Sequence, residues 1–295
     1  MHADETLIGD ALVRRLLAGQ FPRWARLPLK RVRSAGTINA LYRLGDDMVV
    51  RLPRVADGAD DAVKEHAWLP RLAPMLPFPV PEILGLGTPT AEYPWHWSVL
   101  RWLDGDTPAP GPGALTDPGQ LAADLGAFVT ALRGIDLPGG PDAYRGTPLT
   151  AVDAETRSAI ADLRGSVDTG AATAAWEEAL AAPAWTGPPR WLHSDLMPMN
   201  LLVRGGRLAA VLDFGTFGTG DPACDFIPAW NLLPAAVRPA FREAAGADDS
   251  GWARGRGWAL SMALVQLPYY RVTNPVIAGN AEHVIREVLA EQRVL

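Results

Sequence analysis

Hydrophobic and polar positions recur with different periods along the chain of 295 residues. In residues 4–19 the apolar positions return every three or four residues, which predicts an amphipathic helix. Two β-rich runs in "LYRLGDDMVVRLPR" surround a Gly-Asp-Asp turn, a pattern typical of a hairpin. A helical pattern follows in "ADDAVKEHAWLPRLAPML", and "YPWHWSVLRWL" indicates a further strand or strand pair. We therefore expect the first hundred or so residues to be rich in strands.

The strongest interruption of these patterns is "DGDTPAPGPGALTDP", which begins at Asp104 and is dense in proline, glycine and aspartate. Beyond it, Ala- and Leu-rich helical patterns dominate. We expect the domain boundary here, with an N-terminal lobe over 1–103 and a C-terminal lobe over 104–295. The predicted fold class is α+β, with a small β-rich lobe and a larger, mostly helical one.

Within the helical half, the stretch "WLHSDLMPMNLLVRGGRLAAVLDFG" predicts a hairpin. Strand patterns lie on either side of Gly205-Gly206, a dipeptide suited to a two-residue turn with positive φ. Closing that turn places Asn200 and Asp213 near the same open end, and the preceding loop can bring Asp195 there as well. Three oxygen-bearing side chains are thus expected to converge in an otherwise apolar segment, where an unpaired polar group is costly to bury.

Those side chains indicate a chemistry. Amide and carboxylate oxygens suit a hard divalent cation such as Mg²⁺, which takes one or two protein carboxylates and completes its shell with water and phosphate. A further carboxylate nearby can orient a hydroxyl or accept its proton. Phosphoryl transfer requires this combination, because the reaction relies on positioning and on neutralising charge.

The motif "HSDLMPMN", followed by "LDFG", resembles the catalytic and metal-binding loops of protein-kinase-like enzymes. The fuller pattern, with "GTFGTGDPACDF" after it, resembles the aminoglycoside phosphotransferase family. This resemblance implies a two-lobed protein-kinase-like fold that uses ATP, with GTP left open, and Mg²⁺. It further implies that Asp195 is the catalytic base, that Asn200 and Asp213 hold the metal, and that His193 supports the loop.

The resemblance also implies a nucleotide site in the N-terminal lobe. In the family, a lysine on the third strand binds the phosphates and pairs with a helical glutamate; here Arg51 stands in that place, and Glu65 lies in the expected helix. Arginine keeps the charge but replaces a compact ammonium with a planar fork. The other implied contacts are a turn over the phosphates and the backbone of the hinge beside the adenine: Gly36, Thr37, Asn39, Arg101 and Leu103.

Charge and aromatic residues bear on the acceptor. Residues 1–103 carry a net charge of +2 (13 basic, 11 acidic) and residues 104–295 carry −8 (14 basic, 22 acidic). We therefore expect a cationic small-molecule acceptor, although aromatic residues could equally line a pocket for a flatter, less charged antibiotic. Ser194 stands where the family commonly has glycine, and this departure bears on substrate identity. The candidate acceptor contacts are Asp225, Trp230, Glu282 and Glu287.

The acidic balance argues against a nucleic-acid partner, which would require a basic face. The single cysteine, Cys224, and the lack of a long apolar run favour a cytoplasmic protein with no membrane association. The predicted function is an ATP- and Mg²⁺-dependent phosphotransferase acting on a hydroxyl of an aminoglycoside or related antibiotic. Two alternatives stay open: a metabolic kinase for a choline-like or amino-alcohol substrate, and a catalytically silent nucleotide-binding protein of the same fold.

Overall fold

The computed structural model describes residues 8–32, 38–111 and 113–292, and the chain divides into two compact units. The described residues of unit 1 fall within Met1–Met75, Pro79–Gly105 and Ala210–Gly215. Those of unit 2 fall within Leu76–Phe78, Asp106–Ala209 and Thr216–Leu295. The short segment Ala210–Gly215 thus joins unit 1 although it follows a long stretch of unit 2.

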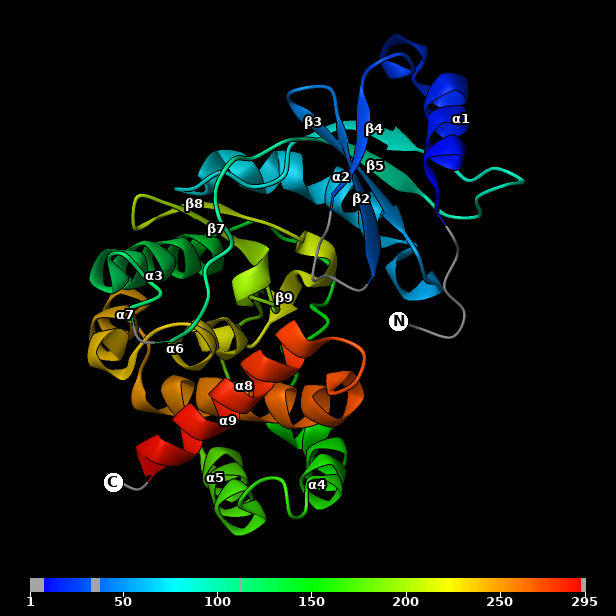
Figure 1. Cartoon of the computed structure of the whole chain (residues 1–295). Helices are drawn as coiled ribbons and strands as arrows, with labels where there is room; N and C mark the ends of the chain where they lie inside the picture. The colour runs from blue at the N-terminus through cyan, green and yellow to red at the C-terminus, as the bar shows by residue number, and fades with distance from the viewer. Residues whose placement is uncertain (1–7, 33–37, 112, 293–295) are drawn as a thin grey trace. The chain divides into compact units, whose positions relative to one another are not determined.

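Unit 1 contains a five-stranded antiparallel sheet in the order β1-β2-β3-β5-β4, with two helices (Figure 1). The strands are β1 (Leu29–Val32), β2 (Asn39–Leu44), β3 (Met48–Pro53), β4 (Ile83–Gly87) and β5 (Trp97–Arg101). The helices are α1 (Asp10–Gln20) and α2 (Asp61–Leu72). The predicted hairpin is present as β2–β3, and its turn contains Gly45 at φ 59°, a value that glycine adopts without steric cost.

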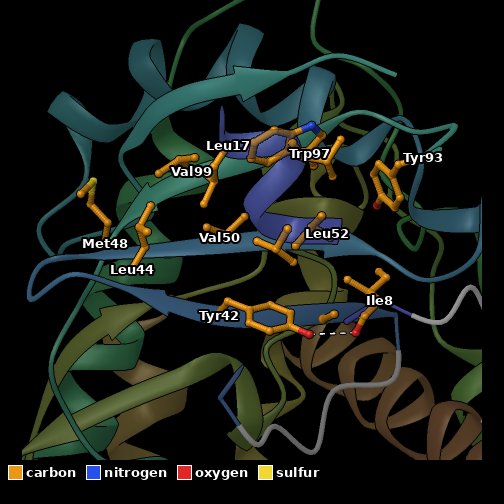
Figure 2. Packing of buried hydrophobic residues seen from close by; sticks show 13 residues of the cluster. Ile8, Leu17, Tyr42, Leu44, Met48, Val50, Leu52, Tyr93, Trp97 and Val99 are labelled. Carbon is orange, nitrogen blue, oxygen red and sulfur yellow. Dashed lines mark hydrogen bonds between the residues drawn. The ribbon is translucent and has the colours of Figure 1, made fainter. Parts of the chain in front are cut away.

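A hydrophobic cluster lies between α1 and one face of this sheet (Figure 2). Leu17 of α1 packs with Tyr42 from β2 and Val50 from β3, and all three are almost fully buried. The Tyr42 hydroxyl donates a 2.8 Å hydrogen bond to the carbonyl of Ile8, so the polar tip of the ring is satisfied within the core. Since side chains alternate along a strand, Arg51 of β3 points to the opposite face, where α2 lies.

Unit 2 is mostly helical (Figure 1). Its described helices are α3 (Pro118–Gly134), α4 (Asp153–Asp162), α5 (Thr169–Ala181), α6 (Pro228–Asn231), α7 (Arg238–Ala244), α8 (Asp249–Tyr270) and α9 (Pro275–Gln292). Helix α8 is buried around much of its circumference and packs against α4, α5 and α9. Its buried Arg254 is paired with Asp221 at 2.7 Å, which compensates for the burial of both charges.

Two short ladders prepare the site: β6 (Arg190–Leu192) pairs with β9 (Gly218–Gly220), and β7 (Leu201–Arg204) pairs with β8 (Arg207–Val211). The second is the hairpin predicted from the sequence, and Gly205 and Gly206 both have positive φ, 58° and 81°. Buried Asp124 of α3 accepts a 3.1 Å hydrogen bond from the backbone N–H of Leu208, which fixes the hairpin to that helix. The α+β class is confirmed. Among the helices described, none is long and apolar enough to cross a membrane.

Candidate active site

Asp225 anchors the backbone of the loop that follows β6. The backbone N–H groups of His193 and Ser194 donate to its two carboxylate oxygens at 2.7 and 2.8 Å. Asp225 is 1% exposed, and burial raises its pKa to about 7 against the opposing effect of these two donors. Asp225 therefore supports the loop and has almost no surface for an acceptor, which corrects the prediction that it contacts substrate. His193 is fully buried, as expected of a supporting residue.

Asp195 and Asn200 are joined directly within unit 2. Asn200 ends a short 3-10 helix over Pro198–Asn200, and its Nδ2 donates to both the carbonyl and Oδ2 of Asp195 at 2.9 Å. Both donated bonds leave from the amide nitrogen, so Oδ1 of Asn200 is the atom that can face a cation. The second carboxylate oxygen of Asp195 accepts a 3.0 Å hydrogen bond from Nη1 of Arg145. The carboxylate is thus held on both sides.

Ser194 adopts the left-handed conformation, with φ 65°, immediately before Asp195. This backbone geometry favours glycine, which gives a physical reason for the glycine that the family commonly has here. The serine offsets part of the strain, because its Oγ donates a 2.8 Å hydrogen bond to the carbonyl of Thr216. In return, Oγ1 of Thr216 donates to the carbonyl of His193 at 3.0 Å.

In unit 1, Arg51 forms a two-pronged ion pair with Glu65 of α2. Nη1 donates to Oε1 at 3.0 Å, Nη2 donates to Oε2, and Nη1 also lies 3.4 Å from Oδ1 of Asp213. Arg51 is 7% exposed and Glu65 is fully buried. Burial lowers the pKa of Arg51, but the charges of Glu65 and Asp213 outweigh it, so the pKa is raised overall and the guanidinium stays charged.

Two further charged residues of α2 belong to the same cluster, and sequence reasoning missed both. Burial raises the pKa of Asp61 to about 6 and lowers that of Lys64. A Cβ on Gly215 would lie 2.5 Å from Oδ2 of Asp61, so any side chain at position 215 would force Asp61 to shift. The signal available in the sequence was spacing, since Asp61 lies four residues before Glu65 and therefore on the same helical face.

The other predicted nucleotide contacts are less defined. Gly36 and Thr37 lie outside the described residues, and Asn39 begins β2, where it pairs with Pro53. Arg101 ends β5, and its backbone N–H already donates to the carbonyl of Glu82 at 2.9 Å. Leu103 follows β5 in the same segment, and its contact with a base stays a prediction.

A sequence profile of the phosphotransferase enzyme family matches residues 31–258, most of the chain. The chain belongs to this family. The membership confirms the family resemblance that "HSDLMPMN" and "LDFG" suggested. No curated protein matches the chain.

Solved structures of phosphotransferases share the fold. The GDP and kanamycin complex of APH(2")-IIia superimposes with a TM-score of 0.75 at 19% identity, covering 96% of this chain and 99% of that one. The streptomycin–ATP complex of APH(2")-IIa gives 0.63 at 15% identity, covering 95% and 97%. Macrolide 2'-phosphotransferase MphH from Brachybacterium faecium gives 0.61 at 22% identity, covering 93% and 97%. The predicted two-lobed, kinase-like phosphotransferase fold is therefore confirmed.

The remaining acceptor candidates of this phosphotransferase-family chain lie in different environments. Trp230 is fully buried and donates a 2.6 Å hydrogen bond to Glu291, which corrects its assignment as an acceptor contact: it belongs to the core. Glu287 pairs with buried Arg238. Glu282 is exposed on α9. Of the four candidates, Glu282 is thus the carboxylate best placed to meet a ligand from solution.

Arg145 was missed at the sequence level. It lies in "PGGPDAYRGTP", a stretch with neither helical nor strand periodicity, and its partner Asp195 is fifty residues away in the chain. No local sequence pattern predicts such a contact. A single arginine between a tyrosine and a glycine was the only sequence signal available.

Proposed function

We propose that this protein transfers the γ-phosphoryl group of a nucleoside triphosphate to a hydroxyl group of a small-molecule antibiotic. The main observation in support of this proposal is the environment of Asp195. Its two carboxylate oxygens accept hydrogen bonds from Asn200 and Arg145 at 2.9 and 3.0 Å. The side chain of Asp195 is 24% exposed, so an acceptor can reach it. Membership of the phosphotransferase family supports the reaction type.

In the proposed step, the acceptor hydroxyl donates its proton to Asp195 as its oxygen attacks the γ-phosphorus. The bond from that phosphorus to the oxygen bridging to the β-phosphate breaks, and the nucleoside diphosphate leaves with the electron pair. Each carboxylate oxygen has a second lone pair, so the bonds from Asn200 and Arg145 leave room for the incoming proton. Proton acceptance by a positioned carboxylate contributes a factor of about 10²–10⁴ to such reactions.

The donor atoms fit a divalent cation. The side chain of Asp213 is 46% exposed, and Oδ1 of Asn200 is not needed for the bonds to Asp195. By the resemblance, Asn200 and Asp213 would hold Mg²⁺, which would neutralise charge on the phosphates. Among the described residues, no group of three or more His, Cys, Asp or Glu side chains could hold a metal ion.

For the acceptor we propose an aminoglycoside first, since exposed Glu282 and the acidic C-terminal half suit a cation. One observation favours a second candidate, a less charged antibiotic such as a macrolide. Macrolide 2'-phosphotransferase MphH shares the fold over 93% of this chain at 22% identity.

The test is transfer of label from γ-labelled ATP or GTP to kanamycin, gentamicin, streptomycin, a macrolide and an amino alcohol, each with Mg²⁺ and with a chelator. We expect Mg²⁺-dependent transfer to at least one antibiotic and none by Asp195→Asn. Transfer only to the amino alcohol would favour a metabolic kinase. Nucleotide binding without transfer to any acceptor would favour a silent protein.

Ionic strength separates the two antibiotic classes. Salt screens charge over roughly 8–10 Å, so the KM of a cationic acceptor should rise with added salt while kcat changes little. A KM that does not respond to salt would favour the less charged class. Glu282→Gln should raise the KM of a cationic acceptor and leave that of a macrolide unchanged.

A further inference from the structure

The segment Pro141–Gly146 of unit 2 carries Arg145, one of the two side chains that hold the carboxylate of Asp195. It lies beside residues 216–221 and is held there largely by backbone hydrogen bonds, to which Oγ1 of Thr219 adds a 3.3 Å bond to the carbonyl of Pro141. Ala143 donates to Thr219 at 3.1 Å, and Tyr144 donates to Thr216 at 3.0 Å. In the other direction Thr219 donates to Pro141, and Asp221 donates to Gly146, both at 2.8 Å. The segment therefore lies against β9, with an isolated parallel bridge between Asp142 and Thr219.

Glycine makes this close approach possible. A Cβ on Gly218 would lie 2.5 Å from the backbone nitrogen of Ala143, and a Cβ on Gly220 would lie 2.7 Å from the carbonyl oxygen of Gly146. The two backbones are thus too close for any side chain between them. The position of Arg145 is fixed by main-chain contacts that do not involve its own side chain.

From this fixed position the side chain of Arg145 reaches the catalytic loop. Nη1 donates to Oδ1 of Asp195 at 3.0 Å and to the carbonyl of Ser194 at 3.2 Å. The guanidinium also lies over the ring of Tyr144, 5.0 Å from its centroid. The side chains of Arg145 and Asp195 are 21% and 24% exposed, so their attraction is only partly screened by water.

We propose that Arg145 is a positioning residue for phosphoryl transfer, which orients the carboxylate of Asp195 toward the acceptor hydroxyl. Asn200 holds one oxygen of that carboxylate and Arg145 holds the other, so together they fix the plane of the group. By also binding the carbonyl of Ser194, the same nitrogen fixes the backbone from which the side chain extends. This role rests on the function proposed above.

A purely structural role would predict a different dependence on the side chain. Four backbone hydrogen bonds hold Pro141–Gly146 in place without help from the guanidinium. Asp225 holds the catalytic loop from the other side through His193 and Ser194. Removing the Arg145 side chain should therefore leave both segments folded and release mainly the carboxylate of Asp195.

The test compares wild type with Arg145→Ala and Arg145→Lys in the full chain, on whichever acceptor wild type uses. Arg145→Ala should lower kcat about 10- to 100-fold, the cost of a small misplacement of a reacting group. The KM for the nucleotide and the thermal midpoint should change little. Arg145→Lys should recover part of kcat, and added methylguanidine should raise the kcat of Arg145→Ala but not that of wild type.

Arg157→Ala is the matched control. Arg157 also belongs to unit 2 and donates to an aspartate, Asp153, at 2.8 Å, but on the surface of α4. Its kcat should equal that of wild type. The inference is overturned if Arg145→Ala keeps wild-type kcat, or if it loses activity together with thermal stability and methylguanidine restores nothing. A wild-type protein that transfers phosphate to no acceptor would instead overturn the proposed function, and the role of Arg145 with it.

Discussion

Two arginine–carboxylate pairs, one in each unit, differ in whether the carboxylate can still bind a further group. Glu65 is fully buried, and both of its oxygens are engaged by the fork of Arg51. Asp195 is partly exposed and receives a single nitrogen of Arg145 on one oxygen. In the first arrangement the two charges neutralise each other out of contact with water, and both carboxylate oxygens are engaged. The second leaves lone pairs open to a substrate, as proton acceptance requires.

The largest expected effect is on turnover at the exposed pair. Asp195→Ala should lower kcat by about two to four decades, because the proton acceptor is lost, and should leave the affinity for MgATP close to wild type. Steady-state kinetics and calorimetric nucleotide titration measure the two quantities. Asp162→Ala, on the exposed surface of α4, is the control and should retain full turnover. Normal turnover in Asp195→Ala would remove the proposed distinction between the two pairs.

The buried pair should instead govern stability. Glu65→Gln should destabilise the protein by about 3–5 kcal/mol, since it leaves the buried cation of Arg51 without its partner. Glu92→Gln breaks the exposed pair with Arg15, whose side chains are 58% and 56% exposed. That change should cost less than about 1 kcal/mol. Denaturant midpoints measure both, and equal midpoints for the two variants would show that burial of the Arg51–Glu65 pair contributes nothing.

The double variant Arg51→Met with Glu65→Leu tests whether the instability of Glu65→Gln comes from the unpaired charge of Arg51. Replacing both charges with apolar groups removes the cost of an unpaired buried ion, so this variant should unfold at a higher denaturant concentration than Glu65→Gln. Nucleotide affinity should nevertheless fall, because the cation beside Asp213 is gone. A double variant less stable than the single one would mean that the pair contributes more than mutual neutralisation.

A third carboxylate beside the buried pair should give a pH dependence of stability. Burial raises the pKa of Asp61 from the ordinary 3.8 to about 6 in the folded protein. The folded state therefore holds this proton more tightly than the unfolded state, and the associated stability is present at low pH and lost as pH rises through about 6. Relative to Asp61→Asn, wild type should lose roughly 2 kcal/mol between about pH 4 and pH 7, at about 1.4 kcal/mol per pKa unit. Parallel melting-temperature profiles for the two proteins would contradict this.

The smallest effect should come from the strained residue next to Asp195. Ser194→Gly removes the strain of a non-glycine residue at φ 65°, about 1–2 kcal/mol. It also loses the hydrogen bond to Thr216, worth about 1 kcal/mol, and raises the conformational entropy of the unfolded chain. These terms nearly cancel, so stability should change by less than about 1 kcal/mol. Ser194→Ala loses the bond without relieving the strain and should be the less stable of the two by thermal unfolding. Since both variants lack the hydrogen bond, the reverse order would show that the extra freedom of glycine in the unfolded chain outweighs the relief of strain.

The parts of the site that were predictable from sequence are those encoded by local spacing. Asn200 lies five residues after Asp195, and a single turn of 3-10 helix is enough to bring its amide back to that carboxylate. Gly205-Gly206 specified the hairpin turn because few other residues adopt positive φ at two successive positions. The residues that make these contacts lie close together in the sequence, so the sequence pattern was sufficient to predict them.

Acceptor residues and long-range partners were not predictable in this way. An aromatic side chain such as Trp230 has the same sequence signature in a pocket as in a core, and here it is fully buried. Net charge of a segment does not reveal which carboxylates are already paired, as Glu287 is with Arg238. The contact between Arg145 and Asp195 depends on how distant segments align along β9, which no periodicity in either segment reports.

The hydrogen bonds that fasten Pro141–Gly146 to the chain around β9 also bear on regulation. In enzymes that are switched on by ordering a loop after the metal-binding motif, that loop must be able to detach. Here residues 216–221 are tied to a neighbour, with glycines excluding any intervening side chain. We expect the amide protons of Ala143, Tyr144, Thr219 and Asp221 to exchange with solvent only on large-scale opening of unit 2. The phosphotransferase proposed above would then need no such ordering step.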